Sequence, residues 1–338
     1  MERQQSLAPL DHFRLHYPVI GSGALGSWLM QGATMFSSFN LRRGLIAGFV
    51  SVAIGLGACD QGDSGPDDAD QETAVEDVAA ASREHGTDSV EPSAGAQVAP
   101  QVAVRSERLP YAEVDNELVY GHFAFPEDMI EPLPAVIVIH EWWGLNENVR
   151  AMADRLAGEG YIVLAVDLFG GDVADSPGPA RQLMLSVVED PDAAVENLRQ
   201  AYDFLDATAG APRIGTLGWS FGGGWALNAA IMLPDELDAT VIFYGQVTDD
   251  EDKLRPLNAP ILGLFGDEDT AVSIESVRNF EAALVRLRKE HDIHIYPEAG
   301  HDFANPADPR YDAEAADDAW GRALQFLDQN LLSEDDAS

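Results

Sequence analysis

Residues 213–225, RIGTLGWSFGGGW, constrain the possible fold of this chain more than any other stretch. A short apolar run leads into the five residues GWSFG at 218–222, and residues 225–232 have the composition of a helix. The order strand, G-x-S-x-G, helix is the context of a nucleophile elbow, which holds a serine at the tip of a tight, strained turn. We therefore expect the Ser220 hydroxyl to lie at the tip of this turn, at the end of a strand. Because G-x-S-x-G is a weak pattern alone, an ordinary glycine-rich turn is the alternative.

Short apolar runs alternate with helical patterns along the rest of the chain. Strands are expected over 111–114, 118–125, 135–140, 161–166, 214–217, 239–244, 261–265 and 291–296, and helices over 148–160, 180–188, 191–208, 225–232, 274–289 and 313–332. The first two strands surround Asp115 and Asn116, which indicate a hairpin turn. Strands that alternate with helices predict an α/β fold with a doubly wound, mostly parallel sheet and an N-terminal antiparallel hairpin.

The region before this domain is typical of an exported protein. Two arginines at 42–43 precede an apolar run at 45–54, and Leu-Gly-Ala-Cys at 56–59 resembles the bacterial lipobox, whose cysteine becomes lipid-modified after cleavage. A transmembrane anchor is the alternative, but the run is short for a membrane span. The sequence predicts a lipoprotein signal peptide over 35–58 and a lipid anchor at Cys59. This places the protein at the bacterial cell envelope, on the periplasmic face of the inner or outer membrane.

Three further segments are expected around this signal. Residues 1–34 precede a normal signal-peptide start at Met35 and are interpreted as a mis-assigned N-terminal extension. Residues 59–100 are rich in Asp, Glu, Ala, Ser, Gly and Gln and contain no aromatic residue, which predicts an acidic disordered tether. Residues 101–338 form the folded domain.

The charge of the chain excludes several classes of partner. It has 58 acidic against 20 basic residues, a formal net charge of −38, so binding to nucleic acid or to an anionic membrane surface is disfavoured. Cys59 is the single cysteine, and the His and Asp residues do not fall at metal-ligand spacings. No nicotinamide fingerprint or phosphate loop is present. We expect no metal and no cofactor, and membrane contact only through the anchor.

A serine nucleophile needs a base that is itself held by an acid, and with an elbow the chain order is Ser, Asp or Glu, then His. After Ser220, a strand closes in Gly-Asp-Glu-Asp. Asp269 is the expected acid because it lies a few residues past the strand end, where a loop can turn it inward, and Asp267 is the runner-up. His301 follows in a glycine-containing loop and is the expected base. Solvated loop charges and a surface histidine are the alternatives for these positions.

The second informative stretch is HEWWGLN at 140–146, after an apolar strand. The turn at this place supplies one of the two oxyanion N–H groups, so the amide of Trp142 is expected to act with that of Phe221. Two tryptophans at a strand end usually line a pocket, although they could be core aromatics. The remaining expected pocket and positioning residues are Glu141, Trp143, Trp219 and Tyr244.

Together these segments resemble the dienelactone hydrolase family of α/β-hydrolases. The resemblance covers roughly 105–332 and is carried by residues 140–146, 167–168, 218–223, 244–245, 266–269 and 298–303. It implies an α/β-hydrolase fold without a large cap domain. It also implies hydrolysis of a carboxylic ester or lactone through an acyl-enzyme intermediate, as in a carboxymethylenebutenolidase.

This chain departs from the family pattern at two positions. Well-known members have cysteine where this chain has Ser220, and there the glutamate matching Glu141 is thought to help generate the thiolate. A carboxylate cannot ionise a serine in that way, so Glu141 is expected to position the hydroxyl or to shape the pocket. Asn305 stands where the dienelactone enzymes place an arginine for the substrate carboxylate, which favours neutral esters or lactones.

Two other functions are compatible with the sequence. A thioesterase or small-peptide hydrolase could use the same scaffold, because specificity depends on loops. A non-catalytic envelope lipoprotein with a relict pocket would also explain the tethered location.

Overall fold

The computed structural model describes most of the predicted folded domain. The predicted extension, the signal peptide and nearly all of the acidic tether, Cys59 included, lie outside the described residues, and their assignments stay predictions. No helix in the described ranges is both long enough and apolar enough to cross a membrane. The ranges that the structure describes are residue 96, residues 98–305 and residues 310–332.

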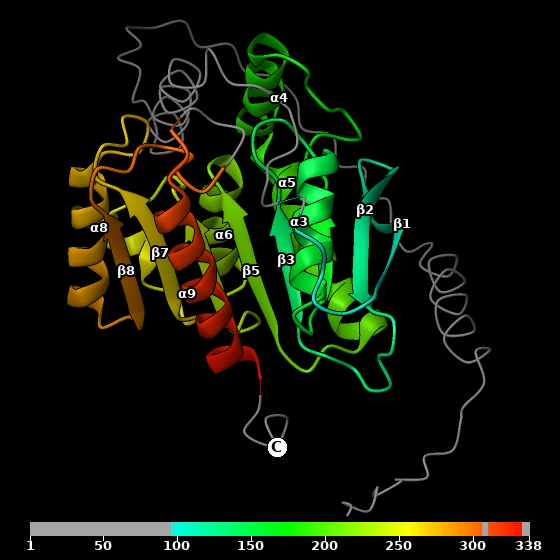
Figure 1. Cartoon of the computed structure of the whole chain (residues 1–338). Helices are drawn as coiled ribbons and strands as arrows, with labels where there is room; N and C mark the ends of the chain where they lie inside the picture. The colour runs from blue at the N-terminus through cyan, green and yellow to red at the C-terminus, as the bar shows by residue number, and fades with distance from the viewer. Residues whose placement is uncertain (1–95, 97, 306–309, 333–338) are drawn as a thin grey trace, which may run out of the picture. The chain divides into compact units, whose positions relative to one another are not determined.

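Within these ranges, eight strands form one sheet in the order β1-β2-β4-β3-β5-β6-β7-β8 (Figure 1). β2 pairs antiparallel with both β1 and β4, and the other pairs are parallel. The predicted fold class is thus confirmed. The strands are β1 (Val104–Val114), β2 (Glu117–Pro126), β3 (Ala135–Ile139), β4 (Ile162–Val166), β5 (Ile214–Trp219), β6 (Ala239–Phe243), β7 (Ile261–Gly266) and β8 (His291–Tyr296).

The N-terminal hairpin has the turn that its sequence predicts. Asp115 and Asn116 have φ angles of 52° and 67°, and these two residues alone separate β1 from β2. Two left-handed residues match the twist of the flanking strands, and Asp and Asn tolerate that conformation.

Helices cover both faces of the sheet, and no separate cap domain interrupts the described chain (Figure 1). α3 and α9 pack on one face, and α5, α6 and α8 pack on the other. α4 lies against α5, and α7 lies against α8. The helices are α3 (Glu147–Ala157), α4 (Pro177–Glu189), α5 (Pro191–Asp203), η2 (Phe204–Ala209), α6 (Phe221–Met232), α7 (Glu251–Leu254), α8 (Ile274–Leu287) and α9 (Ala313–Leu331).

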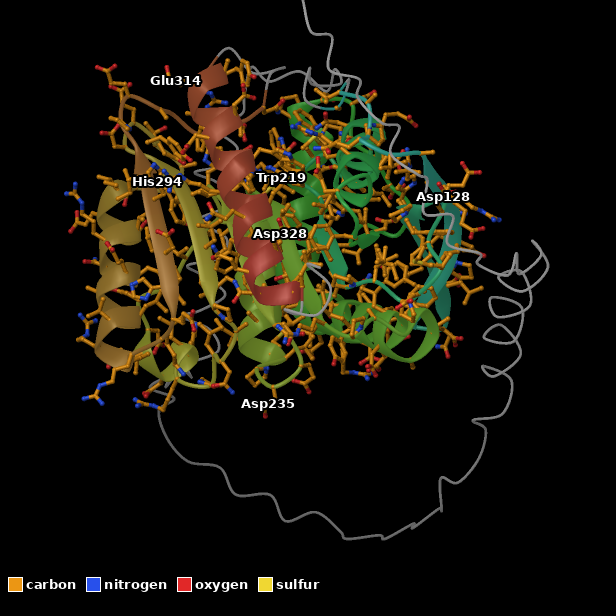
Figure 2. The ribbon with its side chains drawn as sticks, turned by 60° about the horizontal axis from the view of Figure 1, so that its bottom comes forward. Asp128, Trp219, Asp235, His294, Glu314 and Asp328 are labelled. Atoms are coloured by element: carbon orange, nitrogen blue, oxygen red, sulfur yellow. The ribbon has the colours of Figure 1, made fainter. Side chains whose placement is uncertain are left out.

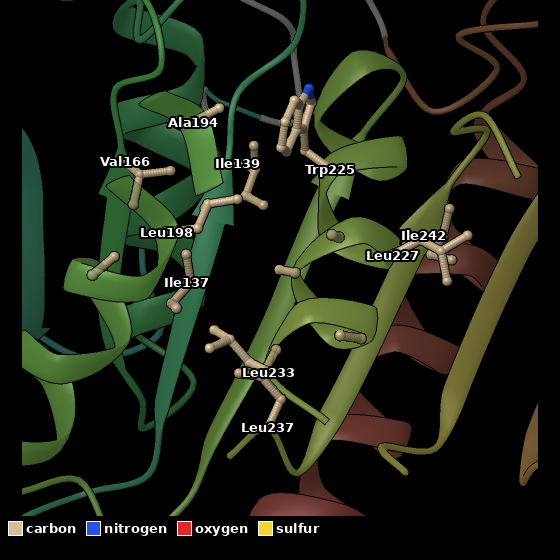
Figure 3. Packing of buried hydrophobic residues seen from close by; sticks show 14 of the residues in the cluster. Ile137, Ile139, Val166, Ala194, Leu198, Trp225, Leu227, Leu233, Leu237 and Ile242 are labelled. Carbon is tan, nitrogen blue, oxygen red and sulfur yellow. The ribbon is translucent and has the colours of Figure 1, made fainter. Parts of the chain in front are cut away.

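The central parallel strands β3 and β4 are apolar throughout because both of their faces are buried. In β3, Ile137 and Ile139 belong to the same core cluster as Leu198 of α5 and Trp225 of α6 (Figure 3). Val138 points to the opposite face and joins the cluster that α3 and α9 cover. Side chains that alternate between two covered faces explain why the sequence shows continuous apolar runs here and no polar alternation.

Most predicted helix ends lie within three residues of the observed ones, but two helices differ by more. α6 begins at Phe221, directly after the serine, whereas the glycines at 222–224 suggested a later start. The helix predicted over 191–208 changes at residue 204 into the π-helical segment η2, which ends at the left-handed Gly210. In the first case, close packing overrides the low helix propensity of glycine.

Exposed carboxylates occur at different edges of the described domain. Asp128, Asp235 and Glu314 are exposed and lie at well separated edges of the domain in Figure 2. Side chains of this kind are solvated, which is the ordinary state of surface carboxylates.

Gly218 and Gly222, on either side of Ser220, lie so close to neighbouring backbone atoms that neither position has room for a side chain. A Cβ on Gly222 would lie 2.2 Å from the carbonyl oxygen of Ile139, at the end of β3. A Cβ on Gly218 would lie 2.1 Å from the carbonyl oxygen of Gly222 itself. The start of α6 is therefore held in direct backbone contact with the end of β3.

Replacement of Gly222 tests this packing. In Gly222→Ala, either β3 or α6 must move, so we expect a loss of about 1–3 kcal/mol of unfolding free energy, measured by denaturant titration. Gly321→Ala is the matched control, because Gly321 is exposed within α9 and its Cβ would meet nothing within 4 Å. It should stabilise the protein by about 0.5–1 kcal/mol. Equal effects of the two substitutions would contradict the packing argument.

Candidate active site

Ser220 stands at the tip of the turn between β5 and α6. Its φ and ψ angles are 51° and −117°, a conformation that a residue with a side chain rarely adopts. Its N–H donates to the carbonyl oxygen of Phe243 at 2.9 Å, which ties the turn to β6. Such strain persists only where surrounding structure fixes it, and it is common at functional sites.

The structure brings the three predicted side chains together although they are far apart in the sequence. Ser220 Oγ lies 2.9 Å from His301 Nε2, and His301 Nδ1 lies 2.7 Å from Asp269 Oδ2. Because a carboxylate only accepts, Nδ1–H donates to Asp269, and Nε2 then accepts from the serine hydroxyl. All three side chains are buried, with the imidazole only 2% exposed. This is the arrangement in which an imidazole can take a proton from a serine.

The two candidate acids have different partners. Asp269 accepts on Oδ1 from the N–H groups of Ala271 and Val272, at 2.8 and 2.7 Å, which leaves Oδ2 for the imidazole. Asp267, the runner-up, accepts from the N–H of Glu298 at 2.7 Å and does not contact the histidine. Asp269 is thus the acid that orients His301 in this structure.

The histidine has two further neighbours. Tyr244 is fully buried, and its ring contacts the imidazole edge-on with centroids 5.2 Å apart. Asp302 was not singled out from the sequence, although it directly follows His301. Its Oδ1 lies 3.8 Å from His301 Nε2, and its Oδ2 lies 3.5 Å from a guanidinium nitrogen of Arg310. A second carboxylate thus lies beside the imidazole, partly balanced by an arginine.

The two predicted oxyanion amides belong to segments that meet at the elbow. Phe221 is the first residue of α6, so its N–H has no acceptor within the helix. Trp142 lies in the loop after β3, buried at 2% exposure, and its ring packs on that of Trp143 with centroids 4.6 Å apart. The contact between Gly222 and the end of β3 keeps these two segments adjacent.

His140 joins the β3 loop to the β4 loop. Its Nδ1 lies 2.6 Å from the carbonyl oxygen of Glu141, and its Nε2 lies 3.1 Å from the backbone nitrogen of Leu168. A carbonyl accepts and an N–H donates, so the ring is neutral with its proton on Nδ1. Burial lowers the pKa of His140 below the ordinary value for histidine, which keeps the ring neutral.

A small pocket lies beside these residues. Three predicted positions line it: Glu141, Trp219, on the sheet face that α9 covers (Figure 2), and Tyr244. Trp143 is not part of its wall and packs into the core instead. The other lining residues are Asn148, Val149, Met152, Ala304 and Asn305. Three of these come from α3, and no sequence pattern indicated that this helix lines the site.

Metal ligation has no evident place here. Among the residues that the structure describes, no three His, Cys, Asp or Glu side chains are grouped as metal ligands would be.

The neutral state of His140 makes stability depend on pH. The unfolded chain binds a proton near pH 6.5, whereas the folded chain resists it, so stability falls as the pH drops below about 6.5. In His140→Gln this group no longer titrates. As the pH falls from 6.5 to 5, we expect the free energy of unfolding of wild type, relative to that of the variant, to decrease by up to about 1.4 kcal/mol per pH unit. Parallel stability curves, measured by urea unfolding, would contradict a neutral His140.

Comparisons with known proteins identify the family of this domain. The profile of the Dienelactone hydrolase family matches residues 119–331. A relative from Saccharolobus solfataricus, provisionally named a carboxymethylenebutenolidase, is 31% identical over 258 residues, which cover 65% of this chain and 98% of the relative. A relative of the same name from Escherichia coli K12 is 34% identical over 225 residues, which cover 62% of this chain and 82% of the relative.

A solved structure also matches. The crystal structure from Klebsiella pneumoniae, provisionally named a dienelactone hydrolase, is 28% identical with a TM-score of 0.61, and the match covers 67% of this chain and 99% of that one. The family profile covers more than half of the chain and spans residues 140–301, which include the site. This chain belongs to the dienelactone hydrolase family of α/β-hydrolases.

Proposed function

We propose that this member of the family is a serine hydrolase that cleaves carboxylic esters or lactones through an acyl-enzyme intermediate. One observation carries the proposal: the buried chain of hydrogen bonds from Ser220 through His301 to Asp269. A serine at the tip of a strained turn, with an imidazole already at hydrogen-bond distance, is arranged for nucleophilic attack.

The residues have separate roles in the proposed reaction. Ser220 attacks the carbonyl carbon while His301 accepts its proton, and the carboxylate of Asp269 stabilises the imidazolium that forms. The amides of Trp142 and Phe221 donate to the oxygen that becomes negative. His301 then returns the proton to the leaving alcohol. Water hydrolyses the acyl-enzyme by the same steps.

The walls of the pocket support a neutral substrate. None of the residues that line it is a lysine or an arginine, and one is the acidic Glu141. Asn305, in the position where the dienelactone enzymes have an arginine, is one of the lining residues. An anionic substrate would approach the pocket of a strongly acidic protein and find no cation in its wall.

Removal of the nucleophile tests the reaction. Ser220→Ala should lower kcat/KM for p-nitrophenyl acetate by about 10⁴- to 10⁶-fold, because the attacking group is gone. Asp269→Asn should lower it by about 10⁴-fold through the wrong histidine tautomer. A fluorophosphonate probe should label wild type but not Ser220→Ala. The proposal fails if a clean preparation of the alanine variant, folded by circular dichroism, keeps the activity.

The charge preference can be tested with two esters of nearly the same shape. Monoethyl succinate has an anionic carboxylate oxygen where ethyl levulinate has a methyl group. Wild type should hydrolyse the neutral ethyl levulinate with at least a tenfold higher kcat/KM in a pH-stat assay. Asn305→Arg should shift this ratio toward the anion by about tenfold, the effect of about 1.4 kcal/mol. Asn305→Gln, which adds length without charge, should leave it unchanged. A wild-type preference for the anion would contradict the neutral-substrate proposal.

A further inference from the structure

The loop between β3 and α3 has to hold one peptide group in a fixed direction if Trp142 is to donate to the substrate. The N–H of Trp142 belongs to the same peptide unit as the carbonyl of Glu141. We propose that His140 is a positioning residue that fixes the Glu141–Trp142 peptide, so that the Trp142 N–H is directed at the substrate oxygen. This inference rests on the proposed function.

The hydrogen bond of His140 acts on the carbonyl end of that peptide. Its Nδ1–H donates to the Glu141 oxygen at 2.6 Å, and the N–H of Gly144 donates to the same oxygen at 3.2 Å. A peptide unit is planar and trans, so its C=O and N–H point in opposite directions. Two donors on the carbonyl therefore set the direction of the Trp142 N–H. They also polarise the amide, which strengthens its N–H as a donor.

The imidazole is held by ring contacts and by hydrogen bonds. Its ring contacts those of Phe169 and Phe221, with centroid distances of 4.5 and 6.2 Å, and these two rings also contact each other at 5.5 Å. The N–H of Leu168 donates to Nε2 and selects the tautomer with the proton on Nδ1. The ring is fully buried, so water does not compete for either nitrogen. Through Phe221, His140 contacts the segment that carries the second proposed oxyanion amide.

A network of buried hydrogen bonds anchors the loop after β4, whose Leu168 N–H donates to His140 Nε2. The hydroxyl of Tyr111, on β1, donates to Asn197 Oδ1 at 2.6 Å and accepts from the N–H of Asp167 at 3.0 Å. Asn197, on α5, donates to the carbonyl oxygen of Asp167 at 2.8 Å. Asp167 directly precedes Leu168. Hydrogen bonds thereby connect the N-terminal hairpin and α5, through the loop after β4 and His140, to the Glu141–Trp142 peptide.

Three substitutions of His140 separate its donor, its acceptor and its ring. His140→Asn places an amide N–H near the Nδ1 position and keeps the donor to Glu141. His140→Gln places an oxygen near the Nε2 position and keeps the acceptor for Leu168. His140→Phe keeps a ring in contact with the two phenylalanines and removes both hydrogen bonds. Each variant is compared with wild type, both as the full chain, for kcat, KM, thermal midpoint and affinity for a small alkylboronic acid, which forms a tetrahedral adduct with the serine.

We expect activity to follow the donor. In His140→Phe and His140→Gln, kcat on ethyl levulinate should fall by about 10- to 100-fold, while KM should change by less than about threefold. This loss is smaller than the loss caused by removing an oxyanion donor altogether. Their affinity for the boronic acid should fall by a similar factor. His140→Asn should keep kcat within about fivefold of wild type. A role in stability alone predicts instead that kcat follows the thermal midpoint and that boronic acid affinity is unchanged.

Two results would overturn the inference. The first is full kcat and full boronic acid affinity in His140→Gln, and the second is an equal loss in the Asn and Gln variants. If His140→Phe does not fold, the Asn and Gln pair still decides. Ser220→Ala distinguishes this failure from that of the proposed function: activity that persists without the serine refutes the hydrolase itself, whereas activity that needs the serine but not the donor refutes only the role of His140.

Discussion

The contact between the start of α6 and the end of β3 is the constraint on which the site depends. Backbone meets backbone there, because a single Cβ on Gly222 would come within 2.2 Å of the Ile139 carbonyl. The helix can then begin directly after Ser220, and the turn takes the strained φ of 51° that presents the hydroxyl. The same contact brings the β3 loop, with Trp142, beside the first free amide of the helix. The proposed nucleophile and the proposed oxyanion donors are thus brought together by one close backbone contact.

Two buried histidines in this site share a protonation state but have different partners. His140 and His301 both carry their proton on Nδ1, as their hydrogen bonds require. His301 donates it to a carboxylate, which can stabilise a positive imidazolium, whereas His140 donates it to a neutral carbonyl and accepts an N–H on its other nitrogen. Burial lowers the pKa of His140, which opposes its protonation. In the proposed reaction His301 transfers the proton, and in the proposed positioning role His140 holds the backbone.

The features that the sequence predicted are those fixed by local pattern. Continuous apolar runs indicated the parallel strands, the Asp-Asn pair indicated the hairpin turn, and the elbow motif indicated the position of the serine. The choice of Asp269 over Asp267 followed from its distance past the strand end. The early start of α6 was missed because glycine is a poor helix former, and only tertiary packing requires it there. The contacts of His140 and Asp302, and the pocket residues from α3, join segments that no local pattern relates.

The most direct test of this account is a crystal structure of the domain with a small alkylboronic acid. The account predicts a tetrahedral boron bonded to Ser220 Oγ, with one boronate oxygen within about 3 Å of the amide nitrogens of both Trp142 and Phe221. A boronate bonded elsewhere, or an oxygen that faces away from these two amides, would contradict it.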